Sequence, residues 1–371
     1  MHTAIAIAAG GGGDAITSAI VASAMPELGI TATMSYSWDR FMIDPTPGPR
    51  VRADFVGLVE SGGIAVVRES AALRTGDSTL PRLAGCMDLP LVLLEAAGGA
   101  VGMADLIRRA ATVFGADELV VVDVGGDVIA EGHESSLRSP LADSLALAAA
   151  MRSGIPTRVL IAGPGLDGEL SPTEVRARID ELDGSRVNNL TARDVMPFNE
   201  IWSWHPSEAT ALLAAAAKGW RGTVETQRDA RVNLTDDATR VYEVNAQALA
   251  SSSLAGPLLP TTSLEQAEQL LRDRRSGFSE LDIERRRAAG ERAEIRMPTK
   301  ESLEVIDNYA AHARAHGVDA LTVRRIAELV HAIDPSATHA LRAMLAEQRP
   351  DSFRPPLYEI ANSATRWLRH P

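Results

Sequence analysis

The sequence predicts a protein of the α/β class, and two observations carry this prediction. Up to about residue 245, short runs of β-branched residues alternate with helical stretches, which is the pattern of a parallel sheet. Glycine-rich segments follow three of the expected strands, where parallel sheets bind their ligands. We therefore expect a Rossmann-like sheet, parallel or partly mixed, with helices on both faces.

The pattern predicts each element in turn. Strands are expected at residues 3–8, 63–67, 91–95, 118–123, 158–162, 222–226 and 239–244. Helices are expected at residues 14–25, 106–114, 139–151, 172–182, 206–218 and 264–274, with Ser171 as an N-cap. A dense charge run at 285–292 precedes residues that are helical by pattern from about 299. We expect an α/β domain at 1–290 and a helical C-terminal extension at 291–371.

The charge of the chain argues against several classes of function. Its 371 residues include 37 Lys and Arg against 49 Asp and Glu, a formal net charge of -12. An acidic chain repels nucleic-acid phosphates, so we expect no nucleic-acid partner. Lys218 and Lys300 are the only lysines, which argues against Schiff-base chemistry, and no P-loop string is present. Nothing indicates haem, flavin or PLP.

The sequence also predicts a compartment. The N-terminus has no basic region before its apolar run, and no apolar run reaches the length of about 18 residues that a membrane helix needs. A single cysteine, Cys86, excludes an internal disulfide, and its context favours a packed side chain over a nucleophile. We expect a cytoplasmic protein with no membrane partner, and assembly into a homo-oligomer stays open.

Four glycines and an aspartate lie where the first expected strand meets the first helix. Glycine lets the backbone approach a ligand, and the free N–H groups at a helix start attract anions. We expect Gly11, Gly12 and Gly13 to hold a phosphate or carboxylate, with a tight structural turn as the alternative. Asp14 would cap the helix, bind a sugar hydroxyl or hold a metal.

The segment after the clearest buried strand is the richest in acids. It holds five carboxylates and one imidazole, from Asp123, Asp127, Glu131, His133, Glu134 and Asp143. So many acids repel one another unless a divalent cation, an arginine or a proton intervenes, and oxygen ligands favour Mg²⁺ or Mn²⁺. The alternative is that Asp143 caps a helix and that Glu131 and Glu134 face water.

We assign roles within this segment as follows. Asp123, Asp127 and Asp143 are the expected metal ligands, while Gly125 and Gly126 open space for a ligand beside the strand end. The expected catalytic acid–base residues are His133, Asp127 and Glu134, because His133 alone among the histidines lies inside the acidic segment.

Two further groups of residues complete the expected site. Ser139, Gly165 and Asp167 are expected to bind the ligand, the last two from the glycine-rich segment 163–170 after another strand. Arg40 and Arg50 flank a proline-rich loop and would bind a carboxylate or phosphate, with a structural ion pair as the alternative. We assign Arg40 to ligand binding. His205, beside two tryptophans, is the second acid–base candidate.

Five motifs occur in a fixed order along residues 3–288: GGGGDA, DRFMIDPTPGP, VDVGGDVIAEGHESSLRSPLADSLALAAA, GPGLDGEL and SLEQAEQLLRDRRSGFSELDIER. In these motifs the chain resembles the DUF1152 family, archaeal and actinobacterial proteins of unassigned function. The resemblance implies one α/β domain and supports the location of the site. It implies no reaction, and residues past about 295 lie outside it.

These features together predict a small-molecule metabolic enzyme. A divalent-metal-assisted hydrolase or group transferase that acts on a phosphorylated or nucleoside-type metabolite fits them best. Two alternatives stay open. One is a lyase or cyclase that acts on a carboxylate substrate, and the other is a non-catalytic module that senses a nucleotide or metabolite. In each case the expected partner is an anionic small molecule.

Overall fold

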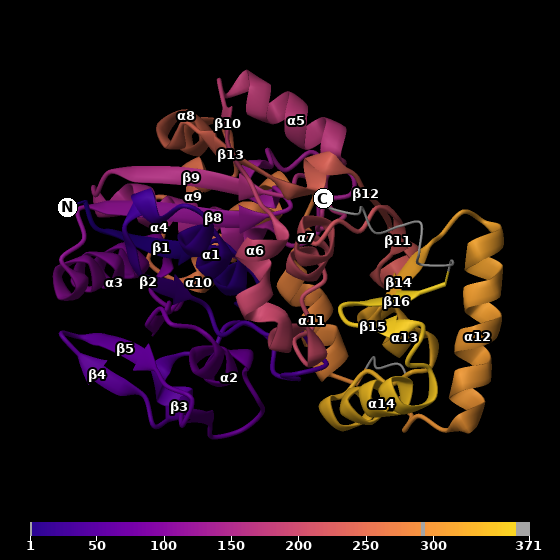
Figure 1. Ribbon diagram of the computed structural model, residues 1–371. Helices are drawn as coiled ribbons and strands as arrows, with labels where there is room; N and C mark the ends of the chain where they lie inside the picture. The colour runs from indigo at the N-terminus through magenta and orange to yellow at the C-terminus, as the bar shows by residue number, and fades with distance from the viewer. Residues whose placement is uncertain (1, 291–293, 361–371) are drawn as a thin grey trace.

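The computed structural model describes residues 2–290 and 294–360 (Figure 1). Its largest element is a nine-stranded sheet in the order β10-β13-β9-β8-β1-β2-β7-β5-β4. The five strands from β9 to β7 in this order run parallel, and antiparallel strands extend the sheet at both edges. The protein is therefore mixed α/β with a mostly parallel central sheet, as the sequence predicts.

The strands of the large sheet include all those expected before residue 220 and the one at 239–244. The parallel strands are β1 (Ala4–Ala8), β2 (Ile30–Ser35), β7 (Leu91–Leu93), β8 (Glu118–Val124) and β9 (Thr157–Ala162). The edge strands are β4 (Val59–Ser61), β5 (Ile64–Val67), β10 (Ser185–Asn189) and β13 (Arg240–Val244). A separate two-stranded sheet pairs β3 (Phe55–Val56) with β6 (Ala72–Leu73).

Helices cover both faces of the large sheet because successive strand residues point to opposite sides. Ile5 and Ile7 lie in a core with helices α3 (Gly99–Phe114), α4 (Pro140–Ser153), α5 (Pro172–Glu181), α8 (Ala246–Ser252), α9 (Ala255–Leu258) and α10 (Leu264–Arg274). Ala4 and Ala8 lie in a second core with α1 (Gly12–Ala24), α2 (Thr79–Cys86), α6 (Ala192–Val195) and α7 (Ala209–Ala217). Ser171 is the N-cap of α5, as expected: its hydroxyl accepts from the Glu174 N–H.

A second sheet, of five strands, lies to one side of the large sheet, at the right in Figure 1. Its strands are β11 (Gly222–Glu225), β12 (Arg231–Leu234), β14 (Ala320–Thr322), β15 (Phe353–Arg354) and β16 (Leu357–Glu359). Because β11 pairs with β14, chain on both sides of residue 290 shares this sheet. Helices α12 (Lys300–Ala315), α13 (Val323–Leu329) and α14 (Pro335–Gln348) share a core with this sheet, whereas α11 (Glu280–Ala288) contributes Leu281 to a core of the large sheet.

The predicted helical extension is therefore confirmed in part. Residues 294–360 do contain three helices, but they also contribute three strands of two or three residues each. Strands this short give too few positions for an alternating pattern to be recognised. The end of the expected charge run, at Glu291 and Arg292, and the final part of the extension, 361–371, lie outside the described residues.

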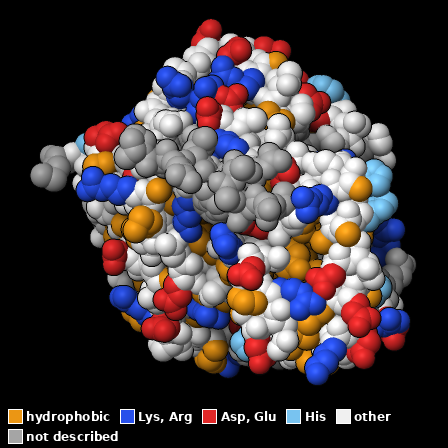
Figure 2. Space-filling model, turned by 45° about the vertical axis from the view of Figure 1, so that its right-hand side comes forward, with side chains coloured by type: hydrophobic (Ala, Val, Ile, Leu, Met, Phe, Trp, Pro, Cys, Tyr) orange, Lys and Arg blue, Asp and Glu red, His pale blue; other side chains and the backbone are white. Residues whose placement is uncertain are grey.

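The surface mixes charges of both signs. Figure 2 shows Lys and Arg side chains interspersed with Asp and Glu on the face that it presents, with apolar side chains between them. Within residues 2–290 and 294–360, no helix is long and apolar enough to cross a bilayer.

The strand order determines where a crevice opens. Along the chain, β1, β2 and β7 add toward one edge of the sheet, while β8 and β9 add toward the other. The order therefore reverses between β1 and β8, and the helices α1 and α4 that follow these strands pack on opposite faces. Loops that diverge in this way leave a crevice at the carboxyl ends of the strands.

Candidate functional site

Two adjoining pockets open at the carboxyl edge of the parallel strands. The inner pocket has a volume of about 160 Å³, and the outer chamber has a volume of about 310 Å³. Arg40, Asp167 and Arg324 line both, so the two are compartments of one crevice.

Most of the predicted site residues meet in the inner pocket. Those that line it are Gly11, Gly12, Gly13, Asp14, Arg40, Asp123, Asp127, Ser139, Asp143 and Asp167. They come from the end of β8, from the segments after β1, β2, β8 and β9, and from the N-cap and first turn of α4. The expected convergence of separate strand ends is thus what the fold produces.

The three predicted metal ligands lie together and are buried. Carboxylate oxygens of Asp123, Asp127 and Asp143 lie within 4.8 Å of one another. Among the described residues, no hydrogen bond of normal geometry reaches either oxygen of Asp123. Burial raises the pKa of all three carboxyls well above the usual range, and the negative charges of neighbouring acids raise it further. Three buried carboxyls without a cation are costly, and a divalent ion with oxygen ligands would offset that cost.

Two more aspartates surround this triad. The Asp14 carboxylate accepts hydrogen bonds from the N–H groups of Gly10 and Val124, both at 3.0 Å, and so joins the loop after β1 to the end of β8. Asp167 accepts from the Glu169 N–H through Oδ1, while its buried Oδ2 has no hydrogen-bond partner in the described chain. Burial raises the pKa of Asp14 to about 7 and that of Asp167 to about 8.

Two glutamates that the sequence analysis did not assign to the site bind the start of α4. Glu169 accepts hydrogen bonds from the N–H groups of Arg138 and Ser139, at 2.7 and 2.9 Å. Glu280, at the start of α11, accepts from the Leu141 N–H at 3.1 Å. Glu169 was visible beside Asp167 in the glycine-rich segment, whereas no local signal connects residue 280 with this site.

These raised pKa values predict how stability depends on pH. Asp167 and Glu280, both with a pKa raised to about 8, keep a proton in the folded state that the unfolded chain releases near pH 4. Stability must therefore fall as pH rises toward 8. His205 has the opposite effect, because its lowered pKa makes stability rise with pH. That effect is confined to pH values below 6.5, the pKa of the histidine in the unfolded chain. We expect the melting temperature of the metal-free protein to fall by about 5 °C between pH 6.5 and 8.

Thermal unfolding in a chelator, repeated across this pH range, measures the effect. Asp167→Asn should flatten the slope, because the amide has no proton to release. A melting temperature that stays level or rises from pH 6.5 to 8 in the unmodified protein would contradict the assigned pKa directions.

The glycines divide into two groups. A Cβ at Gly12 would lie 2.6 Å from the Thr79 hydroxyl oxygen, and one at Gly13 would lie 2.4 Å from that of Ser207, so close packing requires glycine there. The sequence predicts that Gly125, Gly126 and Gly165 bind the ligand, but these three described residues line neither pocket. The Gly125 carbonyl accepts from the Gly165 N–H at 2.6 Å, so these glycines shape the loops that carry the acids.

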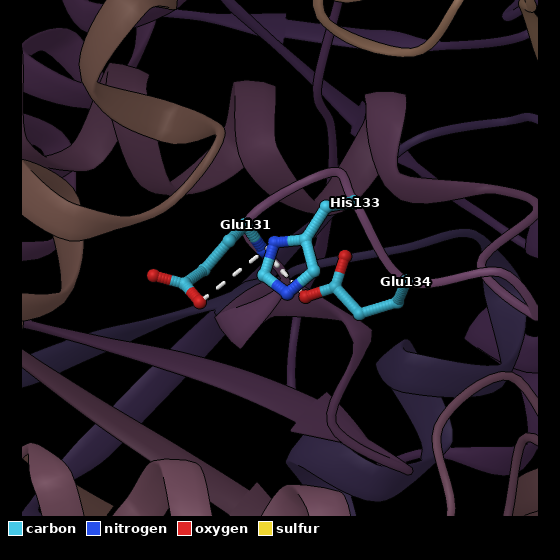
Figure 3. Close-up of side chains that lie close together, drawn as sticks. All are labelled: Glu131, His133 and Glu134. Carbon is cyan, nitrogen blue, oxygen red and sulfur yellow. Dashed lines mark hydrogen bonds and ion pairs between the residues drawn. The ribbon is translucent and has the colours of Figure 1, made fainter.

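The structure does not bring His133 or Glu134 to the crevice. His133 lies between Glu131 and Glu134 on an outer loop, and its side chain is 76% exposed (Figure 3). Glu134 accepts hydrogen bonds from the N–H groups of Glu131 and Gly132, which closes a tight turn. The turn after η3 (Asp127–Ile129) sends these side chains away from the strand end. Their proximity to Asp127 in the sequence is therefore not proximity in space.

His205 is the histidine that lines the inner pocket. Its ring is buried, and burial lowers its pKa to about 3, so the imidazole is neutral near pH 7. Nδ1 accepts a hydrogen bond from the Ser207 N–H at 3.1 Å, which assigns the ring proton to Nε2. Nε2 has no hydrogen-bond partner in the described part of the chain and lies beside the first turn of α1.

The two candidate arginines have different surroundings. Arg50 is buried and forms a bidentate ion pair with Asp44, with N···O distances of 2.6 and 2.8 Å, as in the structural alternative. This pair closes the loop that begins after β2. Arg40, on the same loop, is exposed and lines both compartments of the crevice.

Comparison with known proteins gives one match. The model of a family described as a protein of unknown function, DUF1152, matches residues 5–288. The chain belongs to the DUF1152 family. The searches against curated proteins and against solved structures gave no match.

The DUF1152 match includes the acidic triad but not the whole crevice. Residues beyond 288 that line the outer chamber are Arg324, Glu328, His331 and Ile333. Arg342, in α14, donates hydrogen bonds to the carbonyl oxygens of Trp202, Ser203 and His205 and so fixes the loop that carries His205. The C-terminal segment thus completes a site whose acids belong to the DUF1152 region.

Proposed function

We propose that this DUF1152 protein is a metabolic enzyme of Rossmann-like fold, a divalent-metal-assisted hydrolase or group transferase that acts on a phosphorylated small molecule. The observation that carries the proposal is the buried triad of Asp123, Asp127 and Asp143. The oxygen-only ligand set fits Mg²⁺ or Mn²⁺ better than zinc. When bound, such an ion polarises a phosphoryl oxygen and lowers the pKa of a bound water.

Other residues of the crevice supply the remaining functions. The free N–H groups at the start of α1 and the neutral His205 Nε2–H are hydrogen-bond donors for an anionic oxygen. Asp167 replaces His133 as the proposed acid–base residue, because its unpartnered Oδ2 and its pKa of about 8 suit proton transfer near neutral pH. Arg40 faces the same crevice and would neutralise substrate charge.

The proposal is tested by turnover of a panel of phosphorylated sugars, nucleotides and polyols, followed by ³¹P NMR with 5 mM Mg²⁺ or with a chelator. We expect phosphate release or transfer from one class of compound in Mg²⁺ and none in the chelator. Asp167→Asn should slow turnover about 100-fold or more while Mn²⁺ binding persists. Arg193→Gln, an exposed change on α6 away from both pockets, should leave the rate unchanged.

Two outcomes would contradict the proposal. Equal turnover in Mg²⁺ and in the chelator would remove the metal from the reaction. Binding of a compound without turnover over hours would instead support the metabolite-sensing alternative.

A further inference from the structure

The outer chamber gathers arginines from separate parts of an acidic chain. Five of them line it: Arg40, Arg138, Arg228, Arg287 and Arg324. They come from the loop after β2, the segment before α4, the turn between β11 and β12, helix α11 and helix α13. Seven acidic side chains line the same chamber, but those of Asp44, Glu169 and Glu284 already accept hydrogen bonds from Arg50, Ser139 and Trp38.

The arginines lie close enough to affect one another. The pKa of Arg228 is lowered first by burial and then by the positive charges of Arg138, Arg287 and Arg40. The pKa of Arg324 is lowered to about 10, again by burial first, although Glu208 opposes the shift. The carboxylate of Glu328 opposes both shifts, and a bound anion would offset the remaining repulsion among the arginines.

The backbone under one of these cations is strained. Arg228 has φ 59° and Asp229 has φ 60°, so two successive residues with side chains adopt the left-handed conformation. Such conformations are unfavourable for residues with side chains, and they cluster at ligand-binding sites. The turn is fixed by hydrogen bonds from the Gln227 N–H to Glu208 and from the Arg228 N–H to Glu328. The surrounding contacts thus impose this backbone on a residue that lines the chamber.

Arg324 connects the chamber with the inner pocket. Its side chain is 14% exposed, lines both compartments and pairs with Glu208 at 3.7 Å. One carboxylate at that distance leaves guanidinium N–H groups available for a second acceptor, since arginine carries five. The chamber also has apolar walls, from Met42, Ile283 and Ile333. A ligand that fits these surfaces has a multiply charged anionic group at one end and an apolar or ring-shaped body.

We propose that the outer chamber binds the phosphate group of an organic phosphate through Arg228 and Arg324, and that the C-terminal segment selects this substrate by supplying Arg324. The inference rests on the proposed function, since it places the phosphate in the compartment that adjoins the pocket of the acidic triad. Guanidinium groups match phosphate oxygens in geometry as well as in charge, and several of them favour phosphate over a single carboxylate. Because Arg324 lies outside the DUF1152 match, this selection belongs to the added segment.

Calorimetric titration of the chelator-treated full chain with inorganic pyrophosphate tests the inference. Malonate serves as the dicarboxylate probe. We expect pyrophosphate to bind at least about tenfold more tightly than malonate. Arg228→Gln and Arg324→Gln should each weaken pyrophosphate binding about tenfold or more, and Arg324→Lys should retain part of the affinity. Arg193→Gln is the matched control and should change nothing. If Arg324→Gln does not fold, Arg228→Gln carries the test alone, because Arg228 is more exposed than Arg324.

The outcomes separate this inference from the proposed function. Pyrophosphate binding that survives Arg228→Gln and Arg324→Gln would overturn the chamber as a phosphate site, even if Mn²⁺ binds the acidic triad. Equal binding of malonate would overturn the choice of phosphate over carboxylate. Arginine-dependent binding of pyrophosphate supports the inference, and if Mn²⁺ then fails to bind, the metal-dependent function alone is contradicted.

Discussion

Replacing Asp123 with asparagine is expected to weaken Mn²⁺ binding about 100-fold or more and to raise the stability of the metal-free protein. The side chain lies at the end of β8 with both oxygens buried, and among the described residues no hydrogen bond of normal geometry reaches either oxygen. A neutral amide removes one anionic ligand from the triad and also removes repulsion from Asp14 and Asp167. Electron paramagnetic resonance titration with Mn²⁺ measures the first effect, and urea unfolding in a chelator measures the second.

Glu134→Gln provides the control, because Glu134 belongs to the second group of possible ligands, with the exposed residues Glu131 and His133, outside the crevice. This change should leave Mn²⁺ affinity within about twofold, whereas Asp143→Asn should reproduce the loss seen with Asp123→Asn. The assignment is wrong if Glu134→Gln abolishes binding and the triad variants do not.

Arg50→Ala is expected to destabilise the protein by about 3–5 kcal/mol, because it leaves the buried Asp44 carboxylate without its cation. Both side chains of this pair are less than a tenth exposed, and Arg50 also donates to the Thr75 carbonyl at 3.1 Å. The pair closes the loop that carries Arg40, so we also expect weaker anion binding in the crevice. Urea unfolding at pH 7 gives the stability change.

Arg296→Ala is the matched control for this prediction. Arg296 pairs with Glu294, but both side chains are more than half exposed, so its loss should leave the midpoint of urea unfolding almost unchanged. The double variant Asp44→Asn with Arg50→Met should recover part of the stability, since no unpaired buried charge remains. Equal losses in the single and double variants would show that packing around Arg50 is responsible instead.

The sequence predicts the aspartates of the inner pocket because most of them follow regular strands. The run before Asp123 is a continuous apolar strand, and glycines mark the ends of β1 and β9, so parallel-strand geometry alone brings Asp14, Asp123 and Asp167 to one edge. Asp143 is included because Pro140 and the apolar positions after it predict the start of α4. These inferences use only periodicity and short spacing.

The arginines of the outer chamber could not be predicted in the same way. Strand β2, with sequence ITATMS, has no continuous apolar run, so the loop that follows it was not assigned to the carboxyl edge. Arg228 and Arg324 reach the chamber only because β11 pairs with β14 across about 100 residues of chain. His133 shows the opposite error, since a position six residues after Asp127 lies beyond a turn that points outward. Pairing between distant strands leaves no local pattern for the sequence to show.

Anomalous diffraction from a crystal grown with Mn²⁺ tests the central claim most directly. We expect a peak at coordination distance, about 2.2 Å, from carboxylate oxygens of Asp123, Asp127 and Asp143. A peak at Glu131, His133 and Glu134 with none at the triad would contradict the claim, and so would the absence of any peak in the crevice.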